Sequence, residues 1–163
     1  MNSRPQAAPK STPLTIEQVR EIFHSRGKRS TKPREDLYRL LSQRHDQHLS
    51  AEDLFTLIRQ DSPGISLATV YNTLDALVDV QLLRKIATPI GRARFDTVLE
   101  PHAHVVTADG QVFDVPRDLS DAVFEELISK ILPQIEKRLG VKINRAALKF
   151  LTSASAAQVK AAQ

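Results

Sequence analysis

The sequence predicts an α+β fold in which a helical first half precedes a smaller second half of strands and one long helix. Three observations point to this class. Capping motifs begin amphipathic segments in residues 15–79, an alternating basic segment runs through residues 82–96, and two further strand-like segments flank an Asp-Gly turn at 109–110. We therefore expect a disordered tail at 1–14, a helical domain at 15–96, a hinge at 97–101, a second domain at 102–151 and a C-terminal tail at 152–163.

Composition excludes several kinds of protein. The chain has 163 residues, 41% of them hydrophobic, which is enough for one domain or two small ones. No apolar run approaches the ~18–20 residues that span a bilayer and the N-terminus has no signal-peptide core, so we expect a cytoplasmic protein with no membrane partner. The absence of cysteine excludes disulfides, thiolate zinc sites, iron–sulfur clusters and cysteine nucleophiles. The net charge of +4 and a pI of about 9.6 favour a polyanionic partner.

Four helices are expected in residues 15–79, each with a recognisable start. The first and third begin with a capping box, the second has a proline in its first turn, and the fourth has a serine cap. In order along the chain, these signals are Thr15-Ile-Glu-Gln18, Thr31-Lys-Pro-Arg34, Ser50-Ala-Glu-Asp53 and Ser66. Gly27 is expected to end the first helix.

The fourth helix, from Leu67 to about Asp79, combines an apolar stripe with an opposite face of small and polar residues. That outer face suits close approach to the floor of a DNA groove, although an ordinary surface helix has the same pattern. A basic β-hairpin follows, with strands at 82–87 and 92–96 around a turn at 88–91. Short helices followed by such a hairpin are the order of a winged helix-turn-helix, whose last helix enters the major groove while the hairpin contacts phosphate or the minor groove.

Basic residues flank these helices in two clusters, which are either solvated faces or a footprint for phosphate. For the backbone of double-stranded DNA we expect contacts from Arg20, Lys28, Arg29, Lys32, Arg92 and Arg94. The candidates for base contact on the fourth helix are Thr69, Tyr71 and Asn72. Tyr71 lies at the flank of the helix, where a half-buried packing role fits equally well.

The second half is predicted to be a small α/β dimerisation domain. Two strands at 102–107 and 111–115 join through the Asp-Gly turn, a long helix at 119–139 is kinked or divided by Pro133, and further strands are expected at 141–143 and 146–151. About fifty residues of this kind bury too little surface to be stable alone. We therefore expect a homodimer that packs the apolar helix face of Leu119, Val123, Leu127, Ile131 and Ile135.

Four of the five histidines, at positions 45, 48, 102 and 104, lie where the two domains would meet. His102 and His104 project from the same face of a predicted strand. Asp96 ends the preceding hairpin strand, and Asp114 lies on the strand expected to pair with the histidine strand. Imidazole and carboxylate ligands suit Fe(II), Mn(II), Zn(II) or Ni(II). The spacing alone leaves open whether these residues bind a metal or are structural.

The chain resembles the ferric uptake regulator family in segments that keep their order and spacing. They are His48-Leu-Ser-Ala-Glu-Asp-Leu54, Ile65-Ser-Leu-Ala-Thr-Val-Tyr-Asn-Thr-Leu-Asp-Ala-Leu77, Gly91-Arg-Ala-Arg-Phe-Asp96 and His102-Ala-His104. The resemblance covers roughly residues 15–151. It implies a metal-dependent, dimeric repressor of a palindromic DNA operator, not an enzyme, with its regulatory metal between the two domains. The ligands that the resemblance implies are His48, Asp96, His102, His104 and Asp114.

Aspartate at positions 96 and 114 resembles the peroxide-sensing branch of the family, because iron-sensing members commonly have glutamate there. That resemblance implies that, with Fe(II) bound, hydrogen peroxide oxidises His48 or His102 to 2-oxo-histidine and the DNA is released. Mn(II) would support DNA binding without this reaction, and Zn(II) is a third candidate. A sensor of iron, manganese or zinc availability that ignores peroxide is the alternative within the family.

The chain also departs from the family pattern. Most members bind a structural zinc through two CxxC pairs, so the lack of cysteine implies that this chain has no structural zinc held by four cysteines and stabilises its second domain by apolar packing. The region of the first pair, Thr107-Ala-Asp-Gly110, is one residue shorter, which leaves the register of Asp114 open. His24 and His45 match no ligand position and are expected at the surface.

Two interpretations outside the family remain. A non-haem iron oxygenase also uses two histidines and a carboxylate, but the strand pattern is not that of a jelly roll. A metal-independent winged-helix protein with structural histidines would bind DNA in the presence of chelators.

Overall fold

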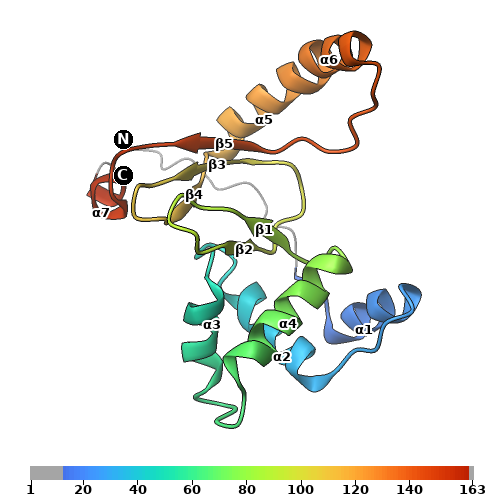
Figure 1. The fold of residues 1–163 in the computed structure, drawn as a ribbon, viewed down its shortest axis with the longest axis vertical. Helices are drawn as coiled ribbons and strands as arrows, with labels where there is room; N and C mark the ends of the chain where they lie inside the picture. Colours follow the sequence, from blue (N-terminus) through green and yellow to red (C-terminus); the bar gives the residue numbers. More distant parts are fainter. Residues whose placement is uncertain (1–12, 162–163) are drawn as a thin grey trace, which may run out of the picture.

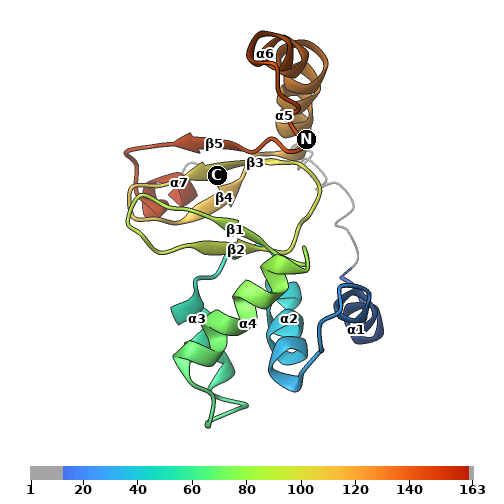
Figure 2. The ribbon, with the colours of Figure 1, turned by 45° about the vertical axis from the view of Figure 1, so that its right-hand side comes forward.

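The computed structural model describes residues 13–161, so most of the tail expected at 1–14 lies outside the described residues. A helical layer lies on one side of two stacked sheets, and a helical arm extends from the other side (Figures 1 and 2). The predicted α+β class is confirmed. None of the helices in residues 13–161 combines the length and the hydrophobicity that a bilayer-spanning helix needs.

The first half contains the four expected helices, and local capping explains where they begin. They are α1 (Ile16–Ser25), α2 (Lys32–Gln43), α3 (Ala51–Ile58) and α4 (Leu67–Asp79). Thr15 and Gln18 form the predicted capping box of α1, in which each side chain accepts a hydrogen bond from the other residue's backbone N–H. Ser50 and Asp53 do the same for α3. Thr31 precedes α2 without a side-chain capping bond.

The helical layer packs around one hydrophobic core. Val70, Leu74 and Leu77 of α4 are fully buried against the other helices, as the apolar stripe predicts. Each such side chain contributes roughly 1.5–3 kcal/mol of hydrophobic stabilisation. The other fully or almost fully buried members include Val19, Phe23, Leu37, Leu41, Leu54, Leu82, Leu83 and Phe95.

The predicted wing is a short hairpin. Strand β1 (Arg84–Ile86) pairs antiparallel with β2 (Arg94–Asp96), with Arg84 opposite Asp96. All three residues of β2 are buried, because β2 lies between the helical layer and the second sheet (Figure 2). Ile86 of β1 forms a small buried cluster with Val106 and Val112 of that sheet.

The second sheet has the order β4-β3-β5. Strand β3 (Ala103–Val106) pairs antiparallel with β4 (Val112–Asp114) and parallel with β5 (Leu148–Leu151). The strand expected at 141–143 does not form, and these residues have no regular structure. The register places His104 opposite Asp114.

The segment expected as a C-terminal tail, 152–163, contains helix α7 (Ala156–Ala161), which the sequence analysis did not predict. The Asp109 carboxylate accepts hydrogen bonds from the Ala156 N–H, at 3.1 and 3.2 Å, and the Ala108 N–H donates to the Ala154 carbonyl. These long-range bonds hold the segment against the turn between β3 and β4, and composition could not reveal them.

Pro133 divides the long helix as predicted. The arm consists of α5 (Arg117–Glu126), a π-helical turn η1 (Leu127–Ile131) and α6 (Leu132–Leu139), which ends at Gly140 with φ 66°. A proline ring clashes with the carbonyl four residues earlier, so the widened turn directly precedes it. Several large apolar residues of the arm are exposed in the single chain: Leu119, Val123, Ile128 and Ile131.

Candidate metal centre

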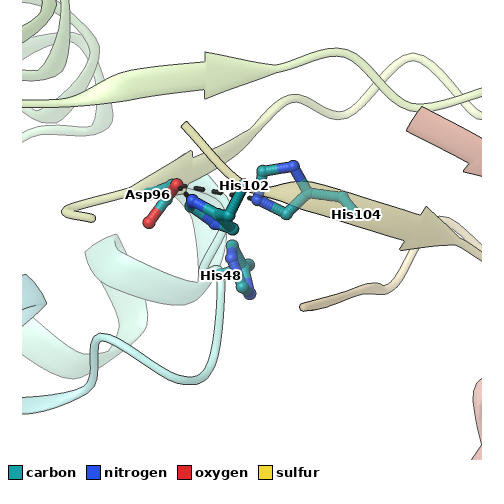
Figure 3. Close-up of side chains that lie close together, drawn as sticks. All are labelled: His48, Asp96, His102 and His104. Carbon is teal, nitrogen blue, oxygen red and sulfur yellow. Dashed lines mark ion pairs between the residues drawn. The ribbon is translucent and has the colours of Figure 1, made fainter. Parts of the chain in front are cut away.

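Four potential ligands converge between the helical layer and the second sheet (Figure 3). One ligand atom from each of His48, Asp96, His102 and His104 lies within 4.8 Å of those of the others. All four residues are buried, with exposed fractions of 2%, 1%, 6% and 8%. His48 comes from the segment between α2 and α3 and Asp96 from the end of β2, whereas His102 precedes β3 and His104 lies on it.

Backbone pairing with β2 positions His48. The Phe95 N–H donates to the Leu49 carbonyl at 3.0 Å, and Ser50 forms an isolated bridge with Arg94. His48 itself has φ 44°, in the left-handed region that costs a non-glycine residue roughly 1–2 kcal/mol. Such conformations persist where surrounding structure imposes them, and they concentrate at functional sites. This one aims the imidazole at the end of β2.

Asp96 and His102 are also held by local hydrogen bonds. Asp96 Oδ1 accepts from the Val98 N–H at 2.8 Å, while its Oδ2 lies 3.4 Å from His102 Nε2 and 3.6 Å from His104 Nε2. His102 Nδ1 lies 2.9 Å from the Glu100 carbonyl, which can only accept, so Nδ1 carries a proton and the Nε2 lone pair of the neutral ring faces the cluster. This arrangement is typical of metal-ligating histidines.

Asp114 completes the group at its outer edge. Its Oδ1 lies 3.1 Å from His48 Nε2, 3.2 Å from His102 Nε2 and 3.5 Å from His104 Nε2, and its side chain is 42% exposed. The shortened turn at 107–111 therefore still brings Asp114 to the histidines. All five residues that the sequence resemblance implies as ligands lie together.

The donor set fits a divalent metal ion. His48 Nε2, Asp96 Oδ2, His102 Nε2 and His104 Nε2 are buried and have no hydrogen-bond partner of suitable geometry among residues 13–161. Burying a polar group without a hydrogen-bond partner costs roughly 1–3 kcal/mol of folding free energy. Four such groups directed at one point therefore indicate a site for a bound ligand. Imidazole nitrogens with carboxylate oxygens suit Fe(II), Mn(II) or Zn(II).

The charges in the cluster favour ionised groups. Burial raises the pKa of Asp114, but contacts with His102 and His48 outweigh burial and hold this pKa far below its ordinary value. Burial lowers the pKa of His102, but Asp114, the Glu100 carbonyl and Asp96 outweigh it and raise this pKa. The metal-free site therefore favours a positive charge, here a proton on His102, at the place where a cation would bind.

The residues expected to contact bases lie on the outward side of α4. Tyr71 is 42% exposed, and its hydroxyl donates to Glu52 on α3 at 2.8 Å. Asn72 is exposed, and Thr69 is half-buried beside Ser66, which caps α4. The outward position of these side chains agrees with the predicted face.

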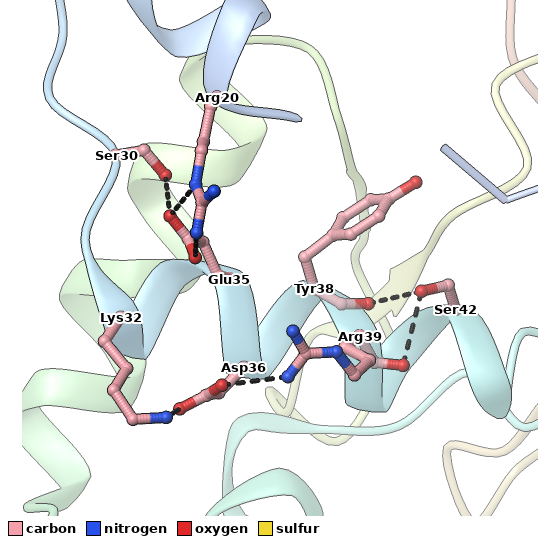
Figure 4. Close-up of polar contacts among 8 residues, drawn as sticks. All are labelled: Arg20, Ser30, Lys32, Glu35, Asp36, Tyr38, Arg39 and Ser42. Atoms are coloured by element: carbon pink, nitrogen blue, oxygen red, sulfur yellow. Dashed lines mark hydrogen bonds and ion pairs between the residues drawn. The ribbon is translucent and has the colours of Figure 1, made fainter. Parts of the chain in front are cut away.

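The predicted phosphate contacts are exposed except for one. Arg20 forms a two-pronged ion pair with Glu35, and Lys32 pairs with Asp36 (Figure 4). Lys28 pairs with Asp79. Arg29 and Arg92 are exposed. Exposed ion pairs contribute only about 0–1 kcal/mol, so pairing does not prevent these side chains from turning to phosphate.

Arg94 is the exception, and it corrects the sequence prediction. Only 7% of this residue is exposed, and its guanidinium pairs with Asp53 and donates to the Gly110 carbonyl. The sequence analysis placed Arg94 with Arg92 among the phosphate contacts. In the structure, however, the helical layer and the second sheet cover the two faces of β2. Arg94 therefore does not lie on the DNA-facing surface.

The remaining histidines lie outside the cluster. His24 is exposed on α1, as expected. His45 is half-buried, which differs from the expectation, and lines a small cavity beside the hinge with Tyr38 and Val98. Ser120, which no sequence motif marks, is fully buried and accepts a hydrogen bond from the Ala103 N–H at 2.8 Å. It ties α5 to the strand that carries His104.

Comparisons with known proteins give a consistent result. The sequence model of the ferric uptake regulator family matches residues 25–151. The ferric uptake regulation protein of Bacillus subtilis is 36% identical over 120 residues, which cover 71% of this chain and 80% of that protein. The peroxide-responsive repressor PerR of Staphylococcus aureus is 29% identical over 89 residues, covering 54% of this chain and 60% of that protein.

Solved structures support the fold. The Helicobacter pylori ferric uptake regulator Fur superposes with a TM-score of 0.68 at 21% identity, over 91% of this chain and 97% of that one. The Campylobacter jejuni peroxide stress regulator superposes with a TM-score of 0.60 at 22% identity, over 87% and 97%.

Proposed function

Because this chain belongs to the ferric uptake regulator family, we propose that it is a metal-dependent, dimeric DNA-binding repressor and not an enzyme. One observation carries the proposal: within the part of the chain that the structure describes, four buried ligand atoms without hydrogen-bond partners converge from the helical layer and the second sheet. A metal ion there would join the two halves of the molecule.

His48, Asp96, His102, His104 and Asp114 are the residues that would hold the ion. Bound Fe(II) would supply one-electron chemistry toward peroxide, whereas Mn(II) or Zn(II) would supply charge and coordination alone. His48 and Asp96 belong to the helical half, and the other three belong to the second half. The ion binds more tightly when both sets of ligands reach it. It therefore favours the arrangement in which the two halves lie together, which we call the closed arrangement.

The proposed DNA surface is the outer face of α4, with flanking basic residues. Thr69, Tyr71 and Asn72 would reach base edges in the major groove. Phosphate contacts would come from Arg20, Lys28, Arg29, Lys32 and Arg92, each of which affects affinity more than sequence choice. A two-fold dimer would require a palindromic operator.

The proposed dimer uses the arm and the free edge of the second sheet. Leu119, Val123, Ile128 and Ile131 expose apolar surface, and Phe150 and Leu151 on edge strand β5 are 48% and 64% exposed. Several large apolar side chains exposed on one arm indicate an interaction site, and an unpaired strand edge is a template for pairing. A second copy of the chain would bury both without a structural zinc.

The site itself is tested by His48→Ala with His24→Ala as the matched control. His48 lies in the cluster, whereas His24 is exposed on α1. We expect His48→Ala to abolish Mn(II)-dependent DNA binding and His24→Ala to retain it, measured by fluorescence anisotropy with an operator fragment. Metal-dependent binding by His48→Ala would contradict the proposed site.

Two regulatory signals fit this site. Aspartate at both carboxylate positions favours peroxide sensing, with His48 and His102 as the oxidised residues, whereas the similarity to the Bacillus subtilis ferric uptake regulation protein favours sensing of metal availability. We propose peroxide sensing as the first of these to test. Anaerobic DNA binding of the Fe(II) and Mn(II) forms, before and after brief peroxide treatment, separates them.

Peroxide sensing predicts that only the Fe(II) form loses DNA and that peptide mass analysis finds one added oxygen on His48 or His102. Unmodified histidines and unchanged, metal-dependent binding would establish the availability sensor instead.

A further inference from the structure

Arg94 connects three elements that come from both halves of the molecule. Its Nη1 lies 2.6 Å from Asp53 Oδ2 on α3, and its Nε donates to the Gly110 carbonyl at 3.1 Å. Arg94 is on β2, and Gly110 is in the turn between β3 and β4 of the second sheet. One buried guanidinium therefore spans the boundary that the metal cluster also spans.

We propose that Arg94 is a positioning residue that locks the second sheet against the helical half without a metal, and so keeps the five metal ligands close together before the ion binds. This inference rests on the proposed function, which it extends to the way the site is preorganised. We call Arg94, Asp53 and Gly110 the Arg94 latch.

The Asp53 carboxylate of the Arg94 latch is held in place by hydrogen bonds that do not involve Arg94. Asp53 Oδ2 also accepts from the Ser50 N–H at 3.0 Å, and the Asp53 N–H donates to Ser50 Oγ at 3.1 Å. The capping box at the start of α3 thus holds the carboxylate in place for Arg94. The guanidinium is buried and the Asp53 side chain is 44% exposed, so this partly buried, charge-assisted pair interacts more strongly than a pair with both partners exposed.

The carbonyl side is fixed by close packing. Gly110 has φ 74°, and a Cβ on it would lie 2.6 Å from two side-chain carbons of Ile90 in the wing turn. A side chain at this position would be strained by the backbone conformation and would displace Ile90, so glycine is favoured here. Lys149 Nζ on β5 also donates to the Ala87 carbonyl of the wing at 3.0 Å. The wing therefore docks on the second sheet at several points around Arg94.

The Arg94 latch shares its elements with the metal ligands. Arg94 is two residues before Asp96 on β2, and Gly110 is in the turn that leads into β4 and Asp114. Release of the latch would let the helical half, with His48 and Asp96, move relative to the second sheet. The apparent metal affinity would then be reduced in proportion to the fraction of molecules in which the two halves remain together.

The first measurement is the Mn(II) affinity of the full chain without DNA, by competition with a chelator of known affinity. We expect Arg94→Gln and Asp53→Asn each to weaken Mn(II) binding by about tenfold, in keeping with loss of one charge-assisted hydrogen bond. The double variant should be no weaker than the weaker single variant, because both changes remove one interaction. Arg92→Gln, on the same wing but exposed, should bind Mn(II) like the wild type.

The second measurement is DNA binding at saturating Mn(II) over a range of salt concentrations. Arg94→Gln should keep the wild-type salt slope, whereas Arg92→Gln should lower it by about one, as loss of one phosphate contact does. A lowered slope for Arg94→Gln, or wild-type Mn(II) affinity, would overturn the proposal. Tighter DNA binding by Asp53→Asn would also overturn it, because a released Arg94 would then be contacting phosphate.

A third readout needs neither metal nor DNA. In the metal-free protein, Arg94→Gln should increase amide hydrogen exchange in the turn 107–111, and unchanged exchange there would overturn the proposal. This exchange measurement tests the Arg94 latch even if the wild type shows no metal-dependent DNA binding. That absence of metal-dependent binding would contradict the proposed function and leave the test of the latch intact. If Arg94→Gln does not fold, Asp53→Asn and Arg94→Lys decide by the same criteria.

Discussion

Metal binding should stabilise the fold by an amount set by the ratio of the free ion concentration to the Kd of the five-residue site. A ligand that binds only the folded state stabilises it by about 2.7 kcal/mol when present at about a hundred times its Kd. For a chain of this size each kcal/mol raises the Tm by roughly 2–4 °C, so Mn(II) should raise it by about 5–11 °C.

The perturbation is His104→Ala, which removes one buried ligand of the cluster. His104 Nε2 is buried and makes no hydrogen bond within residues 13–161, so its removal deletes a ligand atom without breaking a hydrogen bond of that nitrogen. We expect the Mn(II)-dependent rise in Tm to be largely lost in His104→Ala and fully retained in His24→Ala.

The assay is thermal unfolding followed by circular dichroism, at one fixed protein concentration because a dimer's Tm depends on concentration. An equal rise in Tm for His104→Ala and the wild type would place the metal elsewhere. No rise in the wild type would refute the reasoning from the unpartnered ligand atoms.

Three further predictions concern pH, packing and assembly. Because the pKa of His102 is raised, the stabilisation that its protonated form gives the metal-free protein is complete below its ordinary value of about 6.5 and is lost as pH rises through the raised value. A metal needs the neutral imidazole, so Mn(II) affinity in chelator competition should increase over that same pH interval, and a pH-independent affinity would exclude His102 as a ligand. Ser120→Ala should lower the free energy of unfolding of the metal-free protein by about 1–3 kcal/mol in urea titrations, because it leaves the buried Ala103 N–H unpaired, and a wild-type midpoint would argue against this tie. Val123→Glu, which places a charge on the exposed apolar face of α5, should yield monomers in analytical ultracentrifugation, and an intact dimer would move the interface off the arm.

Features that depend on neighbouring residues could be predicted from the sequence. The capping boxes at Thr15 and Ser50, the apolar stripe of α4 and the interruption at Pro133 all follow from spacing within a few residues. The pairing of the two strands around the turn 107–111 also followed from the hairpin pattern, whereas the register that places His104 opposite Asp114 was left open by the sequence and is given by the structure.

Features that depend on distant residues could not be predicted in this way. His48 joins His102 only through the pairing of Leu49 and Ser50 with β2, and the sequence placed it among the ligands by family resemblance alone. Arg94 looked like an exposed basic residue because nothing local shows that two layers cover β2. The C-terminal helix α7 depends on Asp109, which lies 47 residues before Ala156.

The central claim is that a metal ion joins the two halves of the molecule and thereby permits DNA binding. The most direct test is anaerobic equilibrium binding of the wild-type protein to operator DNA, first metal-free, then with Mn(II), and then after addition of excess chelator. We expect weak binding without metal, binding with Mn(II) that is tighter by at least about tenfold, in keeping with a coupling free energy of roughly 1–3 kcal/mol, and full reversal by the chelator. Equally tight binding in all three conditions would contradict the claim.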